Sequence, residues 1–99
     1  KQAVEKGLLW HQKDKLFSRW KERFFIPTKD YCHCFKKDSS KLTEMGEFLF
    51  KVKLVDTDGF SLLDERGYLT ICINQLRDGR LYLRKHGGIR DWFNTIQVR

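Results

Sequence analysis

Apolar and polar residues alternate along several short segments of the first 85 positions, a pattern typical of β-strands, whose successive side chains point to opposite faces. The clearest case is the segment 47–55, where four apolar side chains share one face: Phe48, Phe50, Val52 and Leu54. Asp58-Gly59 and Asp78-Gly79 are turn signals between such segments. The pattern predicts seven strands, at 7–11, 18–26, 31–35, 47–55, 60–63, 68–74 and 81–85.

The hydrophobic period changes after Gly87-Gly88. The apolar residues there are spaced i, i+3, i+4 and i+7, and they are Ile89, Trp92, Phe93 and Ile96. This spacing forms one stripe of an amphipathic helix, so we expect Trp92 in the core. Seven short strands and one helix predict a mainly β fold, in which an antiparallel sheet bends into a sandwich or partial barrel and the helix closes an open end.

The chain has 99 residues, of which 40% are hydrophobic, and we expect a single domain over residues 1–99. It begins at Lys1 without a signal-peptide pattern or a membrane-spanning apolar run, so we expect a domain excised from a larger protein. Its three cysteines lack the spacing of a disulfide framework, which indicates a reducing, intracellular setting. We expect the isolated domain to be monomeric.

Positive charge is concentrated near the N-terminus. The chain has 20 Lys+Arg against 13 Asp+Glu, a net charge of +7. Residues 1–29 hold eight of these cations and three of the acids, which accounts for +5 of that total. Such a balance favours a polyanionic partner, such as an anionic membrane surface, nucleic acid or an acidic protein patch.

The segment 17–25, FSRWKERFF, combines cations and aromatics on one predicted strand. Strand alternation places Lys21 and Arg23 on the same face as Phe25, with Glu22 on the other. One strand face in an open-ended barrel can be core at depth and ligand site at the mouth. We therefore expect Phe25 to lie deeper, while Lys21 and Arg23 point together toward the loop that connects the first two strands and not into bulk solvent.

Several motifs together resemble the pleckstrin homology (PH) domain family. KGLLWHQKDKLFSRWKERFFI resembles the family's first hairpin, with its Gly-x-Leu and Trp-Lys-x-Arg-x-Phe patterns. YCHCF and RLYLRK resemble its third and seventh strands, and Trp92 falls where its terminal helix carries a characteristic Trp. The resemblance covers about residues 4–98. It implies two near-orthogonal antiparallel sheets, of four and three strands, capped by one C-terminal α-helix.

The resemblance also implies a headgroup site in the first hairpin. Lys21-Glu22-Arg23 matches the Lys/Arg-x-Arg part of the family's phosphoinositide signature, while His11 stands where a Lys is usual. We expect four cations to bind the anion, Lys13, Lys15, Lys21 and Arg23, with support from His11 and Arg19. A neutral imidazole contributes little charge at pH 7, so with His11 in this place we expect a weaker site, or one that depends on pH near the ordinary histidine pKa of about 6.5.

These observations predict a non-catalytic membrane-recruitment module that binds phosphoinositides or anionic lipid and lies in the cytoplasm, peripheral to membranes. The alternative is a protein-interaction PH domain with weak or no specific lipid binding, which uses the strand edge at 47–55 or the helix. No nucleophile–base pair or paired acids indicate an enzyme, and no cofactor is expected. Nucleic acid is disfavoured because the aromatics alternate as core residues do and form no exposed stacking row.

Other candidate residues favour structural roles. Cys32-His33-Cys34 lacks a second ligand pair at finger spacing, so we expect no metal site and treat the cysteines as small buried hydrophobes. His86 is interpreted as a solvated loop residue. Trp10 faces away from His11, and either packs on the surface or inserts at a lipid interface.

Overall fold

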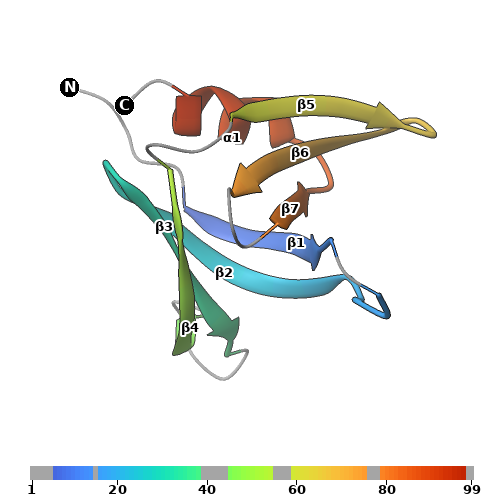
Figure 1. The fold of residues 1–99 in the computed structure, drawn as a ribbon. Helices are drawn as coiled ribbons and strands as arrows, with labels where there is room; N and C mark the ends of the chain where they lie inside the picture. The colour runs from blue at the N-terminus through green and yellow to red at the C-terminus, as the bar shows by residue number, and fades with distance from the viewer. Residues whose placement is uncertain (1–5, 15, 39–44, 55–58, 76–78, 98–99) are drawn as a thin grey trace.

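The computed structural model describes residues 6–14, 16–38, 45–54, 59–75 and 79–97. Seven strands and one helix follow one another in this order: β1 (Gly7–Lys13), β2 (Lys21–Pro27), β3 (Tyr31–Lys37), β4 (Met45–Lys53), β5 (Phe60–Glu65), β6 (Tyr68–Gln75), β7 (Gly79–Arg84) and α1 (Ile89–Gln97) (Figure 1). The predicted number and order of elements are confirmed.

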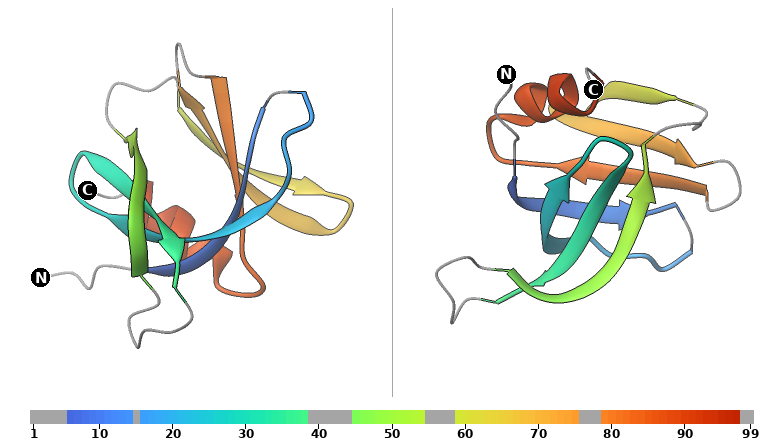
Figure 2. Two further views of the ribbon diagram at one scale, coloured as in Figure 1. Left: turned by 90° about the horizontal axis from the view of Figure 1, so that it is seen from below. Right: turned by 90° about the vertical axis from the view of Figure 1, so that its left-hand side faces the viewer.

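The strands form one antiparallel sheet in the order β4-β3-β2-β1-β7-β6-β5. The expected group of four is β1 to β4 and the expected group of three is β5 to β7. Hydrogen bonding between β1 and β7, from Trp10 opposite Arg84 to Lys13 opposite Leu81, joins them into a continuous sheet. Figure 2 shows how this sheet bends, so that β4 and β5 remain its two edges.

The first hairpin opens toward its loop. β1 pairs with β2 from Gly7 to His11, and then continues to Lys13 alongside β7. β2 begins at Lys21, three residues later than the predicted start at 18, because the preceding backbone is turned at Phe17, whose φ is 65°. The two strands therefore separate beyond the pair His11–Lys21 and leave a mouth in the sheet.

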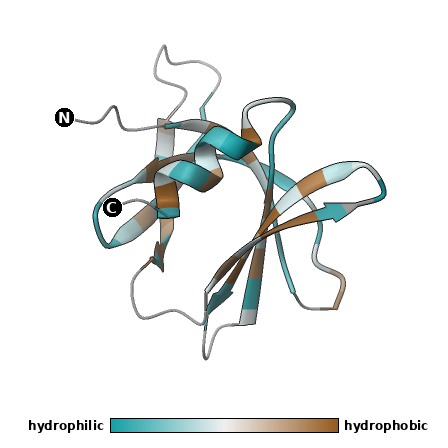
Figure 3. Ribbon diagram, turned by 90° about the horizontal axis from the view of Figure 1, so that it is seen from above, coloured by the Kyte–Doolittle hydropathy of each residue, from teal (hydrophilic) through white to brown (hydrophobic). Residues whose placement is uncertain are grey.

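The core lies inside the bend of the sheet and is closed by α1. Among the described residues, thirteen buried hydrophobic side chains form one cluster, including Phe25 and Trp92, both fully buried. The helical stripe is confirmed, since Ile89, Trp92 and Ile96 are its buried residues. Figure 3 shows hydrophobic and hydrophilic residues alternating along the strands, as the period of two predicts. Burial of such large side chains removes apolar surface from water, which stabilises the fold by about 25 cal/mol for each Å² buried.

One face assignment in β4 is wrong. The four apolar residues predicted to share one face do not all do so: Phe50, Val52 and Leu54 pack in or against the core, but Phe48 is half exposed. The reason is a register shift between Cys34 and Phe35, which places these residues opposite Phe50 and Phe48 respectively. Such a bulge reverses the facing of residues beyond it. Phe48 instead packs edge-on against Phe35, with ring centroids 5.6 Å apart.

Candidate functional site

A pocket of about 380 Å³ opens where β1 and β2 separate. It is lined by His11, Lys13, Phe17, Ser18, Arg19, Lys21, Arg23, Leu49 and Phe50, and is called the basic pocket below. The structure thus brings together five of the six residues nominated from the sequence. The sixth, Lys15, lies outside the described residues. Four lining residues were not nominated: Phe17, Ser18, Leu49 and Phe50. The last two come from β4, whose place opposite the hairpin is set by tertiary structure.

Along the inner face of β2, side-chain exposure increases from the core toward the mouth. Phe25 is fully buried, Arg23 is half-buried and Lys21 is exposed. Both cations line the basic pocket together with the loop residues Phe17 and Ser18, so they share one face as predicted, although Lys21 is also exposed to solvent. The order along the strand follows from alternation on a face that runs from the core to the open mouth.

Arg23 lies between the buried and the exposed end of this face, and its guanidinium has a hydrogen-bond donor without a partner among the described residues. Its Nη1 donates a long hydrogen bond of 3.4 Å to the backbone carbonyl of Glu22. Its Nε is buried and has no hydrogen-bond partner among the described residues. A buried donor without a partner costs about 1–3 kcal/mol, and more when the group is charged. An anion in the basic pocket would relieve that cost.

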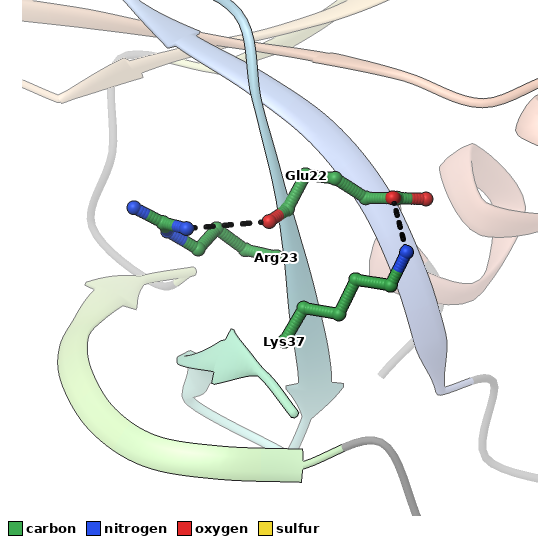
Figure 4. Close-up of polar contacts among 3 residues, drawn as sticks. All are labelled: Glu22, Arg23 and Lys37. Carbon is green, nitrogen blue, oxygen red and sulfur yellow. Dashed lines mark hydrogen bonds and ion pairs between the residues drawn. The ribbon is translucent and has the colours of Figure 1, made fainter. Parts of the chain in front are cut away.

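Glu22 is turned away from the basic pocket, although it lies between the two cations in sequence. Its Oε1 accepts a hydrogen bond from Lys37 Nζ on β3 at 2.9 Å, and Figure 4 shows its side chain directed away from that of Arg23. The carboxylate therefore pairs with Lys37 on the opposite face of the sheet. The described side chains that line the basic pocket include four cations and no acid.

His11 is a buried part of the wall, and of the two alternatives for it, burial favours the neutral ring over titration near pH 6.5. Only 5% of the residue is exposed, and its ring packs edge-on against Phe25 and Phe50 at 5.9 and 5.7 Å. Burial, followed by the charges of Arg23, Lys13 and Lys21, lowers the pKa of His11 to about 4. The imidazole is therefore neutral at pH 7, and it contributes shape and hydrogen-bonding capacity without charge. Neither ring nitrogen has a hydrogen-bond partner among the described residues.

Lys13 extends the basic pocket from the end of β1. Its Nζ lies 4.8 Å from the centroid of the Phe50 ring, a cation–π contact that holds the ammonium group over the mouth. The loop that follows is tied back by Ser18, whose Oγ accepts a hydrogen bond from the Lys13 backbone N–H at 3.1 Å. Gln12 Nε2 donates to the Ser18 carbonyl at 3.0 Å. These bonds hold Ser18 in place, and the next residue, Arg19, lines the basic pocket with Lys21.

The tip of the β1–β2 loop is apolar and exposed. Leu16 is 81% exposed and Phe17 is 89% exposed. Phe17 has a left-handed backbone, which costs a non-glycine residue roughly 1–2 kcal/mol, and its side chain borders the basic pocket. The hairpin therefore presents two large apolar side chains next to a cluster of cations.

The described residues contain no group of three or more His, Cys, Asp or Glu side chains that could hold a metal ion. Cys32 and Cys34 are buried, as expected for small hydrophobes. Burial raises the pKa of Cys34 to about 12, so it stays a thiol. Trp92 is confirmed as a core residue. The only helix in the described part of the chain, α1, has nine residues and is too short to span a bilayer.

The chain is similar to solved structures of PH domains. The carboxyl-terminal PH domain of pleckstrin gives a TM-score of 0.69 at 17% identity, over 97% of this chain and 96% of that one. The same pleckstrin domain in complex with D-myo-Ins(1,2,3,4,5)P5 gives a TM-score of 0.68 at 19% identity, over 96% of each chain. The tandem PX-PH domains of Bem3 from Saccharomyces cerevisiae give 0.68 at 17% identity, over 97% of this chain and 42% of that chain.

No protein-family model matches the sequence, and no curated protein matches it. The similarity is therefore one of structure, and at this level of identity it establishes the fold. The chain has the PH-domain fold, with seven antiparallel strands and one C-terminal helix.

Proposed function

We propose that this PH-fold domain recruits its parent protein to membranes by binding phosphoinositide or other anionic lipid headgroups in the basic pocket. Lys13, Lys21 and Arg23 bind the phosphates, Arg19 adds charge, and His11 shapes the inner wall. Lys15, in the same loop, is proposed to join them. The domain acts without catalysis, as a reversible, peripheral and cytoplasmic membrane module.

The observation that carries this proposal is the buried, unpartnered Nε of Arg23 within a pocket whose described walls hold cations and no acid. A guanidinium offers planar, paired donors that match a phosphate, and Lys21 two residues away adds a point charge on the same face. The pairing of Glu22 with Lys37 keeps the intervening carboxylate outside this field. A pleckstrin PH domain of the same fold, solved with an inositol pentakisphosphate, supports an inositol phosphate as the class of ligand.

The exposed loop tip supports a membrane-bound rather than a soluble ligand. Leu16 and Phe17 stand beside the cations, where a headgroup bound in the pocket would bring them to the lipid interface. Apolar side chains gain free energy on entering that boundary, and each nearby cation contributes about 1 kcal/mol at an anionic leaflet. Headgroup binding and shallow insertion would therefore act together.

Vesicle co-sedimentation tests the proposal. Binding should rise with phosphoinositide content and fall as salt increases. Lys21→Ala with Arg23→Ala should weaken it by about 30-fold or more, since two cations together are worth about 2 kcal/mol. Lys29→Ala with Lys53→Ala is the matched control, because it removes two exposed lysines at the other end of the strands and should change binding far less.

The outcome also decides between lipid and protein ligands, the two classes for which a PH fold serves as a module. Absence of vesicle binding at low salt, or binding that survives the Lys21/Arg23 change in a folded protein, would favour the protein-interaction function. Such a partner is then expected to bind the edge strand β4 or the helix α1.

A further inference from the structure

A second and larger cavity, of about 910 Å³, lies on the outer face of the sheet, between β1, β6, β7 and the start of α1. We call it the outer cleft; its aromatic and cationic walls are Trp10, Trp20, Tyr68, Arg84, Lys85 and Arg90. Trp10 and His11 are neighbours on β1, so their side chains point to opposite faces. The outer cleft and the basic pocket therefore lie on opposite faces of the sheet, and no residue in the described part of the chain lines both.

A stack of alternating rings and charge builds the wall of the outer cleft. The Arg84 guanidinium lies 4.4 Å from the centroid of the Trp20 ring and 5.2 Å from that of Tyr68. Its Nε donates to Thr70 Oγ1 at 2.8 Å, which fixes the group across β6 and β7. The stack holds both rings in place, yet Tyr68 remains 64% exposed. Trp10, also exposed, stands beside Arg84 in the strand register.

These features differ from those of the basic pocket. The Arg84 guanidinium is covered by rings and already donates to Thr70, whereas Arg23 has a buried donor without a partner. The outer cleft therefore suits flat apolar groups better than a phosphate. Arg84, Lys85 and Arg90 outnumber Asp91 among its charged walls, three to one, so the surroundings of the aromatic platform are positive.

We infer that the outer cleft binds a proline-rich peptide segment flanked by acidic residues. Such segments form a polyproline II helix without internal hydrogen bonds, and their rings pack into aromatic-lined grooves. The exposed rings of Trp10 and Tyr68, together with the half-buried ring of Trp20, supply the platform, and indole N–H groups can donate to peptide carbonyls. The polyproline II helix of the peptide is already stiff before it binds, so little conformational freedom is lost on binding. The cations complement the acidic flanks.

The inference adds a protein ligand on the face opposite the proposed lipid site. It does not require lipid binding, since the two sets of residues are separate. When both sites are occupied, a partner could dock while the β1–β2 hairpin faces a membrane.

The test is a titration of the isotope-labelled domain with the peptide EEPPPPPEE, followed by NMR. The indole N–H signals of Trp10 and Trp20 should shift saturably, while that of the fully buried Trp92 serves as an internal reference and should stay in place. Tyr68→Ala should weaken binding by about tenfold, the value of one aromatic packing contact. Phe48→Ala removes an exposed aromatic outside the cleft and is the matched control.

Peptide variants and a competing anion separate the alternatives. Replacing the prolines with glycine should abolish binding, and replacing the glutamates with lysine should weaken it. Lys21→Ala with Arg23→Ala should leave peptide binding intact, which separates this result from any failure of the lipid proposal. Equal binding of the glycine peptide, or no saturable shift of Trp10 and Trp20, overturns the inference. Shifts of these signals produced by inositol hexakisphosphate and not by the peptide would also overturn it, and would indicate an anion site.

Discussion

The Glu22 carboxylate pairs with Lys37 Nζ at 2.9 Å, on the face of β2 opposite the basic pocket. Glu22 is flanked in sequence by Lys21 and Arg23, and strand alternation is what separates its charge from theirs. The pair bridges β2 and β3 while the two cations stay available on the inner face. The charge of the basic pocket is therefore set by the facing of side chains, rather than by the local composition of the sequence.

Replacement of Glu22 by Gln should therefore affect stability slightly and lipid binding little. The pair is partly exposed, and such ion pairs contribute about 0–1 kcal/mol. Urea unfolding should show a loss within that range, and vesicle affinity should stay within about twofold of the unmodified protein. A large rise in affinity would mean that Glu22 opposes the anion, contrary to its observed direction.

The burial of His11 predicts a pH-dependent stability. Its pKa is lowered to about 4 in the folded protein, against about 6.5 when unfolded, so the unfolded state binds more protons between these values. The contribution of His11 to the free energy of unfolding is therefore greatest above pH 6.5. It decreases as the pH falls, by about 3 kcal/mol at pH 4. Urea unfolding at several pH values measures this slope, and His11→Leu should flatten it.

His11 also predicts that lipid binding has no transition near pH 6.5. Because the imidazole stays neutral down to about pH 4, its charge is the same at pH 6 and pH 7.5. Vesicle affinity at these two pH values should differ little, with a lipid whose own charge is constant over the range. A strong increase at pH 6 that His11→Leu removes would show that the ring gains charge at the membrane.

The apolar loop tip predicts a difference between membranes and soluble ligands. Leu16→Ser with Phe17→Ser should reduce vesicle binding by about tenfold, since apolar contacts with the lipid boundary are lost. Affinity for a soluble inositol phosphate, measured by calorimetry, should change by less than about twofold. Stability should not fall, because both side chains are exposed. An equal loss in both assays would indicate that the tip shapes the basic pocket itself.

Local pattern was sufficient for much of the fold and for part of the site. Alternation along 18–26 predicted the common direction of Lys21 and Arg23, and the helical stripe predicted the burial of Trp92. The burial of His11 was also readable, since it shares its face of β1 with Leu9. It was missed because the resemblance placed a cation there.

Contacts between distant segments were beyond the reach of local pattern. The register shift at Cys34/Phe35 exposes Phe48, and nothing in the alternation of 47–55 indicates it. The stack of Trp20, Arg84 and Tyr68 unites three segments whose spacing depends on the order of strands in the sheet. For the same reason, Leu49 and Phe50 could not be assigned to the basic pocket in advance.

The central claim is that Arg23 binds an anion from inside the basic pocket, and its side-chain Nε–H signal tests this most directly. In an NMR titration with a soluble inositol phosphate at low salt, we predict a saturable shift of that signal, with the Nε–H of Arg84 as a reference that stays unchanged. Saturable binding that leaves the Arg23 signal in place, or no binding at all, would contradict the account.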